Sequence, residues 1–206
     1  SYAFLGELKE KKILEIGGGG GEQAAYFCSQ GADVTVIDIS SKSVIEIQTL
    51  AEKKRMKIKV LQMNAEELHF SDDFDLIYIN STLMHVHQQK VLQQCSTILK
   101  KEGKVVIIEP MRYAPLVQFY RFFSSYRKMK PKYATLKMFK EGKKYFAEYR
   151  HQEFYLFSSL LLPAFYVRND VLHRMYRAVA TFDSALIKLF PFVRYACWVS
   201  VVEYRK

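Results

Sequence analysis

The chain has 206 residues and half of them are hydrophobic, which predicts one domain with a sizeable core. Its formal net charge of +10 favours an anionic partner, either nucleic acid, a membrane surface or a charged small molecule, or it reflects only a basic solvated surface. No apolar run approaches the roughly 20 residues that span a bilayer, and the three scattered cysteines fit neither a zinc site nor a disulfide framework. We therefore expect a cytoplasmic protein that needs no metal and has no secretory leader.

The first informative stretch is a short apolar run, 13–16, that ends in the five consecutive glycines 17–21. An apolar run of this length with turn residues at its end predicts a buried strand. Glycines in series permit a tight turn and a close approach of the backbone to a ligand. A helix is predicted next, over 22–30. A strand, a glycine turn and a helix N-terminus together form a corner that binds nucleotides.

A second strand is predicted over 33–37, because this segment is continuously apolar and β-branched, and it ends at Asp38. Asp38 lies 21 positions after Gly17 (38 − 17), close to the roughly 20 expected for an acid that holds a ribose. We predict that Asp38 binds the ribose hydroxyls of a nucleotide and that Ile39 lies beside it. The alternative is a helix-capping acid, because a helix is predicted over 41–55.

Two further strands, predicted over 58–63 and 74–79, each end in polar residues. Asn64 follows the first of them, and Asn80 and Ser81 follow the second. In an open parallel sheet, ligands bind outside the carboxyl ends of the strands. These side chains are therefore expected to line the same pocket as Asp38. A helix over 90–99, a turn at 100–103 and a strand over 104–109 complete this half.

The spacing Glu15-x-Gly17-x-Gly19-x-Gly21 resembles motif I of the class I S-adenosylmethionine-dependent methyltransferases. Dinucleotide-binding folds usually read Gly-x-Gly-x-x-Gly, and here Glu22 stands where their third glycine would be. The pattern thus favours a methyltransferase. A nicotinamide-dependent oxidoreductase is the alternative enzyme class.

Three later segments resemble the same family, in the small-molecule type with a UbiE-like core. Residues 64–70 resemble its Asp-Ala-x-x-Leu-Pro-Phe segment, with Asn64 in place of the acid and His69 in place of the proline. Residues 74–85 resemble its Phe-Asp-x-Ile…Leu-x-His segment, and 99–103 its Leu-Lys-Pro-Gly-Gly turn. The resemblance implies S-adenosyl-L-methionine as methyl donor and S-adenosyl-L-homocysteine as product.

The resemblance also implies roles for the residues at the predicted strand ends. The motif I acid would lie near the amino-acid end of the donor, the glycines would let that end approach the backbone, and residues 64–66 would flank the adenine. The predicted cofactor site comprises Glu15, Gly17, Gly19, Gly21, Asp38, Ile39, Asn64, Ala65, Glu66, Asn80 and Ser81.

The fold that we predict is α/β, a Rossmann-like doubly wound, mostly parallel seven-stranded sheet with an antiparallel last strand and a helical cap insertion after strand five. Residues 1–206 are expected to form a single methyltransferase domain. Within it, 12–110 would be the cofactor-binding core, 111–147 a substrate cap and 148–206 the completion of the sheet. In this last part we predict a strand over 147–162, a helix over 168–190 and a strand over 195–204.

The stretch 111–149 is basic and aromatic, and three interpretations stay open for it. It could be a lid over a small or lipid-like acceptor, a nucleic-acid surface or a membrane-surface helix. We favour the lid, because no RNA-binding module accompanies it. The predicted function is methyl transfer to an oxygen or amine of a small, anionic or lipid-like molecule. The alternatives are an RNA-associated methyltransferase or adaptor and a NAD-binding oxidoreductase, and the oligomeric state is not predicted.

A proton acceptor would be needed wherever the methyl acceptor carries a proton. The candidates for this catalytic role are His85, Tyr113 and His151. Two large apolar side chains, Met175 and Trp198, are predicted to lie in the core rather than in a site. Tyr2 and Phe4 are expected to cover the cofactor site.

Overall fold

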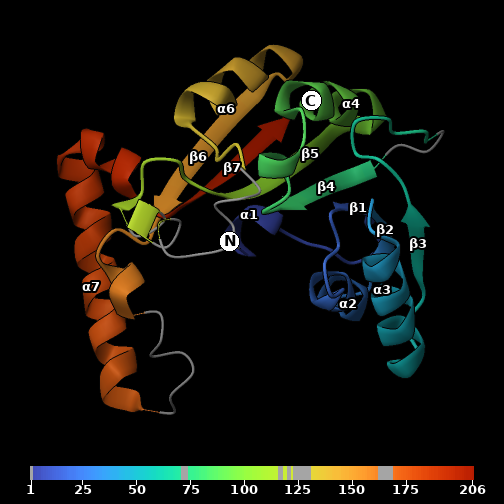
Figure 1. Ribbon diagram of the computed structural model, residues 1–206, viewed down its shortest axis with the longest axis horizontal. Helices are drawn as coiled ribbons and strands as arrows, with labels where there is room; N and C mark the ends of the chain where they lie inside the picture. Colours follow the sequence, from blue (N-terminus) through green and yellow to red (C-terminus); the bar gives the residue numbers. More distant parts are fainter. Residues whose placement is uncertain (1, 71–73, 116–117, 120–121, 123–130, 162–168) are drawn as a thin grey trace.

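The fold is a seven-stranded sheet with helices on both faces (Figure 1). The computed structural model describes residues 2–70, 74–115, 118–119, 122, 131–161 and 169–206. The strand order is β3-β2-β1-β4-β5-β7-β6, and β7 runs antiparallel to both of its neighbours. This confirms the predicted sheet and its antiparallel last strand. The strands are β1 (Lys12–Ile16), β2 (Asp33–Asp38), β3 (Ile58–Gln62), β4 (Phe74–Asn80), β5 (Leu99–Pro110), β6 (Glu148–Phe154) and β7 (Val199–Arg205).

The inner strands carry apolar residues on both faces because helices cover both faces, as in parallel sheets generally. On one face, alternate residues such as Leu14 and Ile77 pack against α4 (Gln88–Ile98) and α6 (Leu136–Gly142). On the other face, residues such as Ile13 and Val36 pack against α1, α2 and α3. These three helices are α1 (Tyr2–Leu5), α2 (Glu22–Ser29) and α3 (Ser41–Lys53).

The helix starts follow from side chains that accept hydrogen bonds from free backbone N–H groups. Ser40 Oγ accepts from Ser43 at the start of α3, and His87 Nδ1 accepts from Lys90 at the start of α4. Asn169 Oδ1 does the same at the start of α7 (Asp170–Leu189), the longest described helix. The 3₁₀ segments in the described part of the chain include η1 (Leu83–His85), η3 (Lys143–Tyr145) and η5 (Pro191–Ala196).

Strand β5 is longer than predicted, since the predicted turn at 100–103 lies inside it. Its pairing with β4 jumps from Phe74↔Leu99 to Leu76↔Lys104, and Glu102 adopts a left-handed conformation with φ of 67°. The turn is thus an irregularity within a continuous strand. Residue types alone do not distinguish such an irregularity from the end of a strand.

The C-terminal part differs more from the prediction. Strand β6 ends at Phe154 and not at residue 162, and β7 begins at Val199, because residues 191–196 form η5. The helix α7 is found where predicted, but it stands at the carboxyl ends of β5 and β6 and away from the two layers that cover the sheet (Figure 1). Met175, predicted to be buried, is 49% exposed on α7. None of the described helices is long and apolar enough to cross a membrane.

The predicted cap insertion after β5 is described only in part. Its described helix, α6, buries Leu136, Met138 and Phe139 in the core beside α4. Residues 116–117, 120–121 and 123–130 of this stretch lie outside the described part of the chain. The cap therefore stays a prediction.

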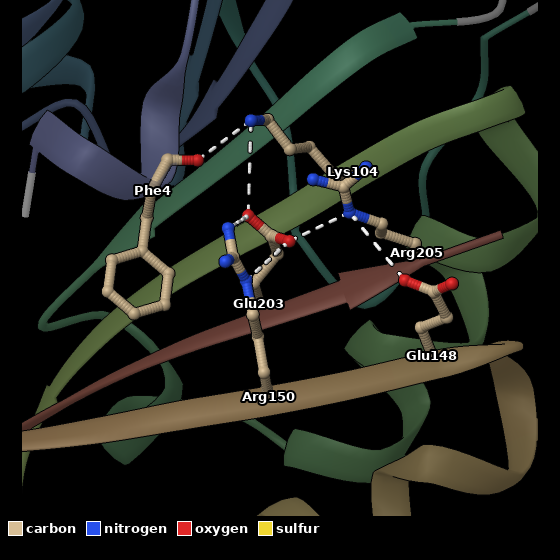
Figure 2. A network of polar contacts seen from close by, with 6 residues as sticks. All are labelled: Phe4, Lys104, Glu148, Arg150, Glu203 and Arg205. Atoms are coloured by element: carbon tan, nitrogen blue, oxygen red, sulfur yellow. Dashed lines mark hydrogen bonds and ion pairs between the residues drawn. The ribbon is translucent and has the colours of Figure 1, made fainter.

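An ion network closes the amino-terminal edge of the second half of the sheet (Figure 2). Glu203, whose side chain is almost completely buried, accepts two hydrogen bonds of 2.8 Å from Arg150 and one of 2.8 Å from Arg205. Burial acts to raise the pKa of Glu203, but these hydrogen bonds outweigh it and hold the pKa below its ordinary value. Lys104 joins this carboxylate to α1, because its Nζ donates to the Phe4 carbonyl at 2.7 Å.

The expectation that Phe4 covers the cofactor site is wrong. Its ring is buried in the core, and the Arg150 guanidinium lies 4.9 Å from the ring centroid. This places α1 against β6 and β5, near their amino ends, where it covers the sheet rather than a ligand.

Candidate functional site

The glycine turn leaves β1 at the carboxyl edge of the sheet and leads into α2. Gly17 donates its N–H to the Ile37 carbonyl at 2.8 Å and has φ of 80°, a conformation that favours glycine. A Cβ there would also overlap the side chain of Thr82. At Gly19 the same Cβ direction meets no described atom within 4 Å. The turn is therefore packed at its base and open at its tip.

Glu15 lies directly beneath this turn and is buried. Burial and the neighbouring Glu22 carboxylate raise the pKa of Glu15 to about 8, although a hydrogen bond from the backbone N–H of Ala24 lowers it. Among the described residues, no group donates to its Oε2 atom. A buried carboxylate oxygen without a donor is costly, and a bound ammonium group would satisfy it.

Asp38 stands at the end of β2, beside the glycine turn. Its Oδ1 accepts from the backbone N–H of Ser40 at 2.9 Å, and its Oδ2 accepts from Gly19 at 3.4 Å. An ionised carboxylate has about four acceptor sites, so two remain for hydroxyl groups of a ligand. Ile39, which follows it, is 70% exposed and presents apolar surface at the same edge.

The residues after β3 form a tight turn. Asn64 Oδ1 accepts from the backbone N–H of Glu66 at 3.0 Å, and Ala65 is buried. The Glu66 carboxylate accepts from the His87 backbone N–H at 2.8 Å and lies 3.9 Å from Lys90 Nζ. This residue therefore ties the turn to the start of α4. The amide group of Asn64 keeps its two N–H donors for other partners.

The end of β4 is bent sharply toward the glycine turn. Ser81 has φ of 54°, which is uncommon for a residue with a side chain, and its backbone N–H donates to Ile108 at 2.9 Å. Its hydroxyl donates to Asn80 Oδ1 at 3.1 Å. Thr82 Oγ1 reaches the Ile16 carbonyl at 3.2 Å, which joins the ends of β1 and β4. Asn80 and Ser81 are both exposed at this junction.

Glu109, to which no sequence motif assigns a role, holds this bend in place. Its carboxylate is fully buried at the end of β5 and accepts from the Leu83 backbone N–H at 2.6 Å. Burial raises its pKa to about 8, against hydrogen bonds from the backbone of residues 82–84 that lower it. An acid directly after four β-branched apolar residues and before a proline is a signal that could have identified it.

The three candidate bases lie in different places. His85 and Tyr113 are both exposed and follow β4 and β5, at the carboxyl edge. His151 lies within the edge strand β6, where its Nδ1 is 2.6 Å from Glu153 Oε1 and its ring stacks on Tyr149. The structure thus puts His85 and Tyr113 at the edge that carries Asp38, and His151 on the outermost strand.

An apolar cavity of about 240 Å³ opens beyond the ends of β5 and β6. Trp198, which the sequence assigned to the core, is only half-buried and lines this cavity. Nearly all of the lining is apolar or aromatic. It consists of Ala114, Pro115, Tyr155, Leu156, Phe157, Ser159, Leu160, Ala196 and Trp198.

A comparison with known protein families concerns the same segment that builds the glycine turn, Asp38 and the β4 bend. Residues 14–107 match the family model described as "Methyltransferase domain". This segment of the chain is similar to that domain, and it makes up a little less than half of the 206 residues. The resemblance of the glycine motif is thereby confirmed, and the predicted fold agrees with the solved structures of this family.

Two curated relatives illustrate the likeness. Over 129 residues the chain is 33% identical to the ubiquinone/menaquinone biosynthesis C-methyltransferase UbiE of Psychromonas ingrahamii, covering 58% of this chain and 51% of that protein. Over 104 residues it is 38% identical to a ubiquinone biosynthesis O-methyltransferase of Rickettsia typhi, covering 49% of this chain and 42% of that protein. The chain spans about half the length of the curated relatives that it matches.

A solved structure shares the fold over the whole length of this chain. Phosphoethanolamine N-methyltransferase 2 of Haemonchus contortus, in complex with S-adenosyl-L-methionine, aligns with a TM-score of 0.71. The identity is 17%, and the alignment covers 100% of this chain and 51% of that one. The likeness therefore concerns the fold.

Proposed function

We propose that this protein transfers a methyl group from S-adenosyl-L-methionine to a small acceptor. One observation carries the proposal. The open glycine turn, the buried Glu15 carboxylate and Asp38 converge at the carboxyl edge of a methyltransferase core. The buried Glu15 oxygen without a described donor suits the ammonium of the donor's amino-acid end, and Asp38 suits its ribose hydroxyls.

The remaining predicted contacts complete this proposed site. Ile39 would cover one side of the adenine, and Asn64 with the backbone of Ala65 would bind its edge. Asn80 and Ser81 would line the region between the glycine turn and the acceptor. When bound, S-adenosyl-L-methionine supplies an electrophilic methyl group on a positively charged sulfur, so the protein's own task is alignment of the acceptor and removal of its proton.

The acceptor that the cavity fits best has an apolar or aromatic body. A cavity lined by Trp198, Tyr155 and Leu160 gains free energy from burying apolar surface and offers few partners for a polar ligand. We propose a hydroxyl oxygen as the acceptor atom, with His85 or Tyr113 receiving its proton, since both follow strands that end at this edge. The names of the two curated relatives, a C- and an O-methyltransferase, are compatible with an aromatic acceptor.

The test is transfer of a radiolabelled methyl group to a series of phenols and catechols that carry alkyl tails of increasing length. The expected result is a KM that falls as the tail lengthens. Ala196→Phe, which fills the cavity, should raise the KM for the longer acceptors about tenfold, because overpacking excludes the ligand. Ala147→Phe is the matched control, because Ala147 is exposed at the opposite edge of the sheet.

Two results would contradict the proposal. One is tight binding of NAD together with failure to bind S-adenosyl-L-homocysteine, which would support the oxidoreductase. The other is methylation of single-stranded RNA, or methylation of the phenols and catechols at carbon atoms only, with Ala196→Phe as active as Ala147→Phe. In that case the apolar cavity would not be the acceptor site.

A further inference from the structure

Helix α7 is attached to the rest of the molecule in an unusual way. Of its 20 residues only Asp183 is buried. The Asp183 carboxylate accepts hydrogen bonds from the backbone N–H groups of Leu156, Phe157 and Ser158 at 2.9–3.1 Å, and from the Ser158 hydroxyl at 2.7 Å. A polar clamp therefore fixes the helix, and a side of the helix roughly a quarter of a turn from Asp183 is left open.

That open side carries large apolar side chains at helical spacing. We call Val171, Met175, Phe182 and Leu189 the apolar stripe; each is between 49% and 73% exposed. Spacings of four, seven and seven positions place them on one face of α7. Exposed apolar residues continue the stripe beyond its C-terminal end and beside it. They are Phe157, Leu160, Phe190, Phe192 and Tyr195.

A basic rim, composed of Arg174, Arg177 and Lys188, runs beside the apolar stripe. All three side chains are exposed, and at 100° per residue they lie on the neighbouring side of the helix. The one acid exposed on α7 is Asp170. An apolar face bordered by cations is the pattern of helices that lie in the interface of an anionic bilayer.

We propose that the apolar stripe and its basic rim dock this protein on an anionic lipid surface. The charge pattern favours this occupant over a second copy of the chain. A symmetric dimer through this face would bring two equally basic surfaces together, each belonging to a chain with a net charge of +10. Anionic headgroups attract the same surface.

The cavity beyond β5 and β6 shares a wall with this surface. Phe157 and Leu160 line the cavity and are exposed beside the stripe, and the ring centroids of Phe157 and Phe182 are 6.4 Å apart. Apolar surface is therefore continuous from the stripe to the cavity. This step rests on the proposed function: an acceptor dissolved in the bilayer would reach the cavity without crossing water.

The docking itself is tested without donor or acceptor, by sedimentation of the whole chain with vesicles. Vesicles of phosphatidylcholine with 30% phosphatidylglycerol should bind the protein, and pure phosphatidylcholine should bind it at least tenfold more weakly. Leu189→Glu should lower binding to the anionic vesicles at least tenfold. Ile45→Glu, at an equally apolar exposed position on α3, should leave it unchanged. Arg174→Gln with Arg177→Gln should lower it about tenfold, and so should high salt.

The affinity for S-adenosyl-L-homocysteine, measured for each variant, serves as the control for folding. Equal binding to neutral and anionic vesicles, absence of binding, or equal effects of Leu189→Glu and Ile45→Glu would overturn the proposal. So would a dimer in analytical ultracentrifugation that Leu189→Glu dissociates, or binding of single-stranded RNA in place of vesicles. A protein that binds the homocysteine but not vesicles would refute the docking alone. One that binds vesicles but not the homocysteine would refute the proposed function alone.

Discussion

The two halves of the sheet are stabilised by different means. In the half that ends at Pro110, α2, α3 and α4 each bury apolar residues against strands that are apolar on both faces. In the half that begins at Glu148, the longest described helix, α7, is fixed through one buried carboxylate, that of Asp183. A second buried carboxylate, that of Glu203, joins β7 to the amino-terminal part of β6.

Under the proposals above, the first half is the scaffold that would hold S-adenosyl-L-methionine, and the second half is the region that would recognise the acceptor. Apolar packing on both faces fixes the strand ends, and with them Asp38 and the glycine turn. A helix that is fixed by polar contacts keeps its apolar side for another surface, since a soluble monomer seldom exposes a large contiguous apolar patch without a function. The predictions that follow test this difference, beginning with the largest expected effect.

Asp183→Ala should release α7 while the first half of the sheet stays folded. The change leaves the backbone N–H groups of residues 156–158 without their acceptor, which costs about 3 kcal/mol or more. Hydrogen exchange should accelerate in residues 155–160 and in α7, and not in β1 or β4. Asp170→Ala, an exposed acid in the first turn of the same helix, should cost less than about 1 kcal/mol. Uniform loss of protection would contradict the separation of the two halves.

Glu203→Gln should weaken the junction between β7, β6 and α1. A neutral amide cannot pair with Arg150 and Arg205, so about 2 kcal/mol of unfolding free energy should be lost, as measured by urea denaturation. Glu148→Gln is the matched control. Glu148 is exposed, and its carboxylate lies 3.9 Å from the Arg205 Nε atom, so this ion pair contributes little to stability. If the two variants are equally stable, the buried network does not join these elements.

Glu15→Gln should change how the stability of the first half depends on pH. The pKa of Glu15 is about 8 in the folded protein, so between the ordinary glutamate range and pH 8 the folded state holds a proton that the unfolded state has lost. Stability should therefore fall as the pH rises through this window, by about 1.4 kcal/mol per pH unit for each such group. Glu109 contributes a similar slope.

The variant should remove the Glu15 share, roughly half of that slope, in urea titrations at pH 5.5, 6.5 and 7.5. The exposed Glu52 provides the control, and Glu52→Gln should leave the slope unchanged. A slope that does not respond to Glu15→Gln would mean that this carboxyl is already ionised in the folded protein.

The sequence was sufficient to predict those parts of the fold that depend on a short stretch of neighbouring residues. Strands β1, β2 and β4 are short, largely apolar runs, as expected in a sheet that is buried on both faces. The spacing of Glu15, the glycines and Asp38 indicates a fixed geometry at the strand ends. The positions of these residues at one edge follow from the parallel order of the strands.

What the sequence did not reveal depends on contacts between distant residues. The periodicity of α7 predicts an amphipathic helix, but it does not say which part of the apolar face is covered, and Met175 proved to be exposed. The functions of Asp183 and Glu109 depend on backbone N–H groups that are more than 20 residues away in the chain. The irregularity at Glu102 likewise depends on the register with β4.

The central claim is that a sulfonium nucleoside binds at the carboxyl edge of β1 and β2, with its ribose on Asp38. Calorimetric titration with S-adenosyl-L-homocysteine tests it most directly, in the unaltered chain, in Asp38→Ala and in Asp33→Ala, an exposed aspartate at the opposite end of the same strand. The account predicts one site per chain, a loss of affinity of about 10- to 100-fold for Asp38→Ala, equivalent to about 1–3 kcal/mol, and no change for Asp33→Ala. Equal affinities for the two variants, or no binding to the unaltered chain, would contradict it.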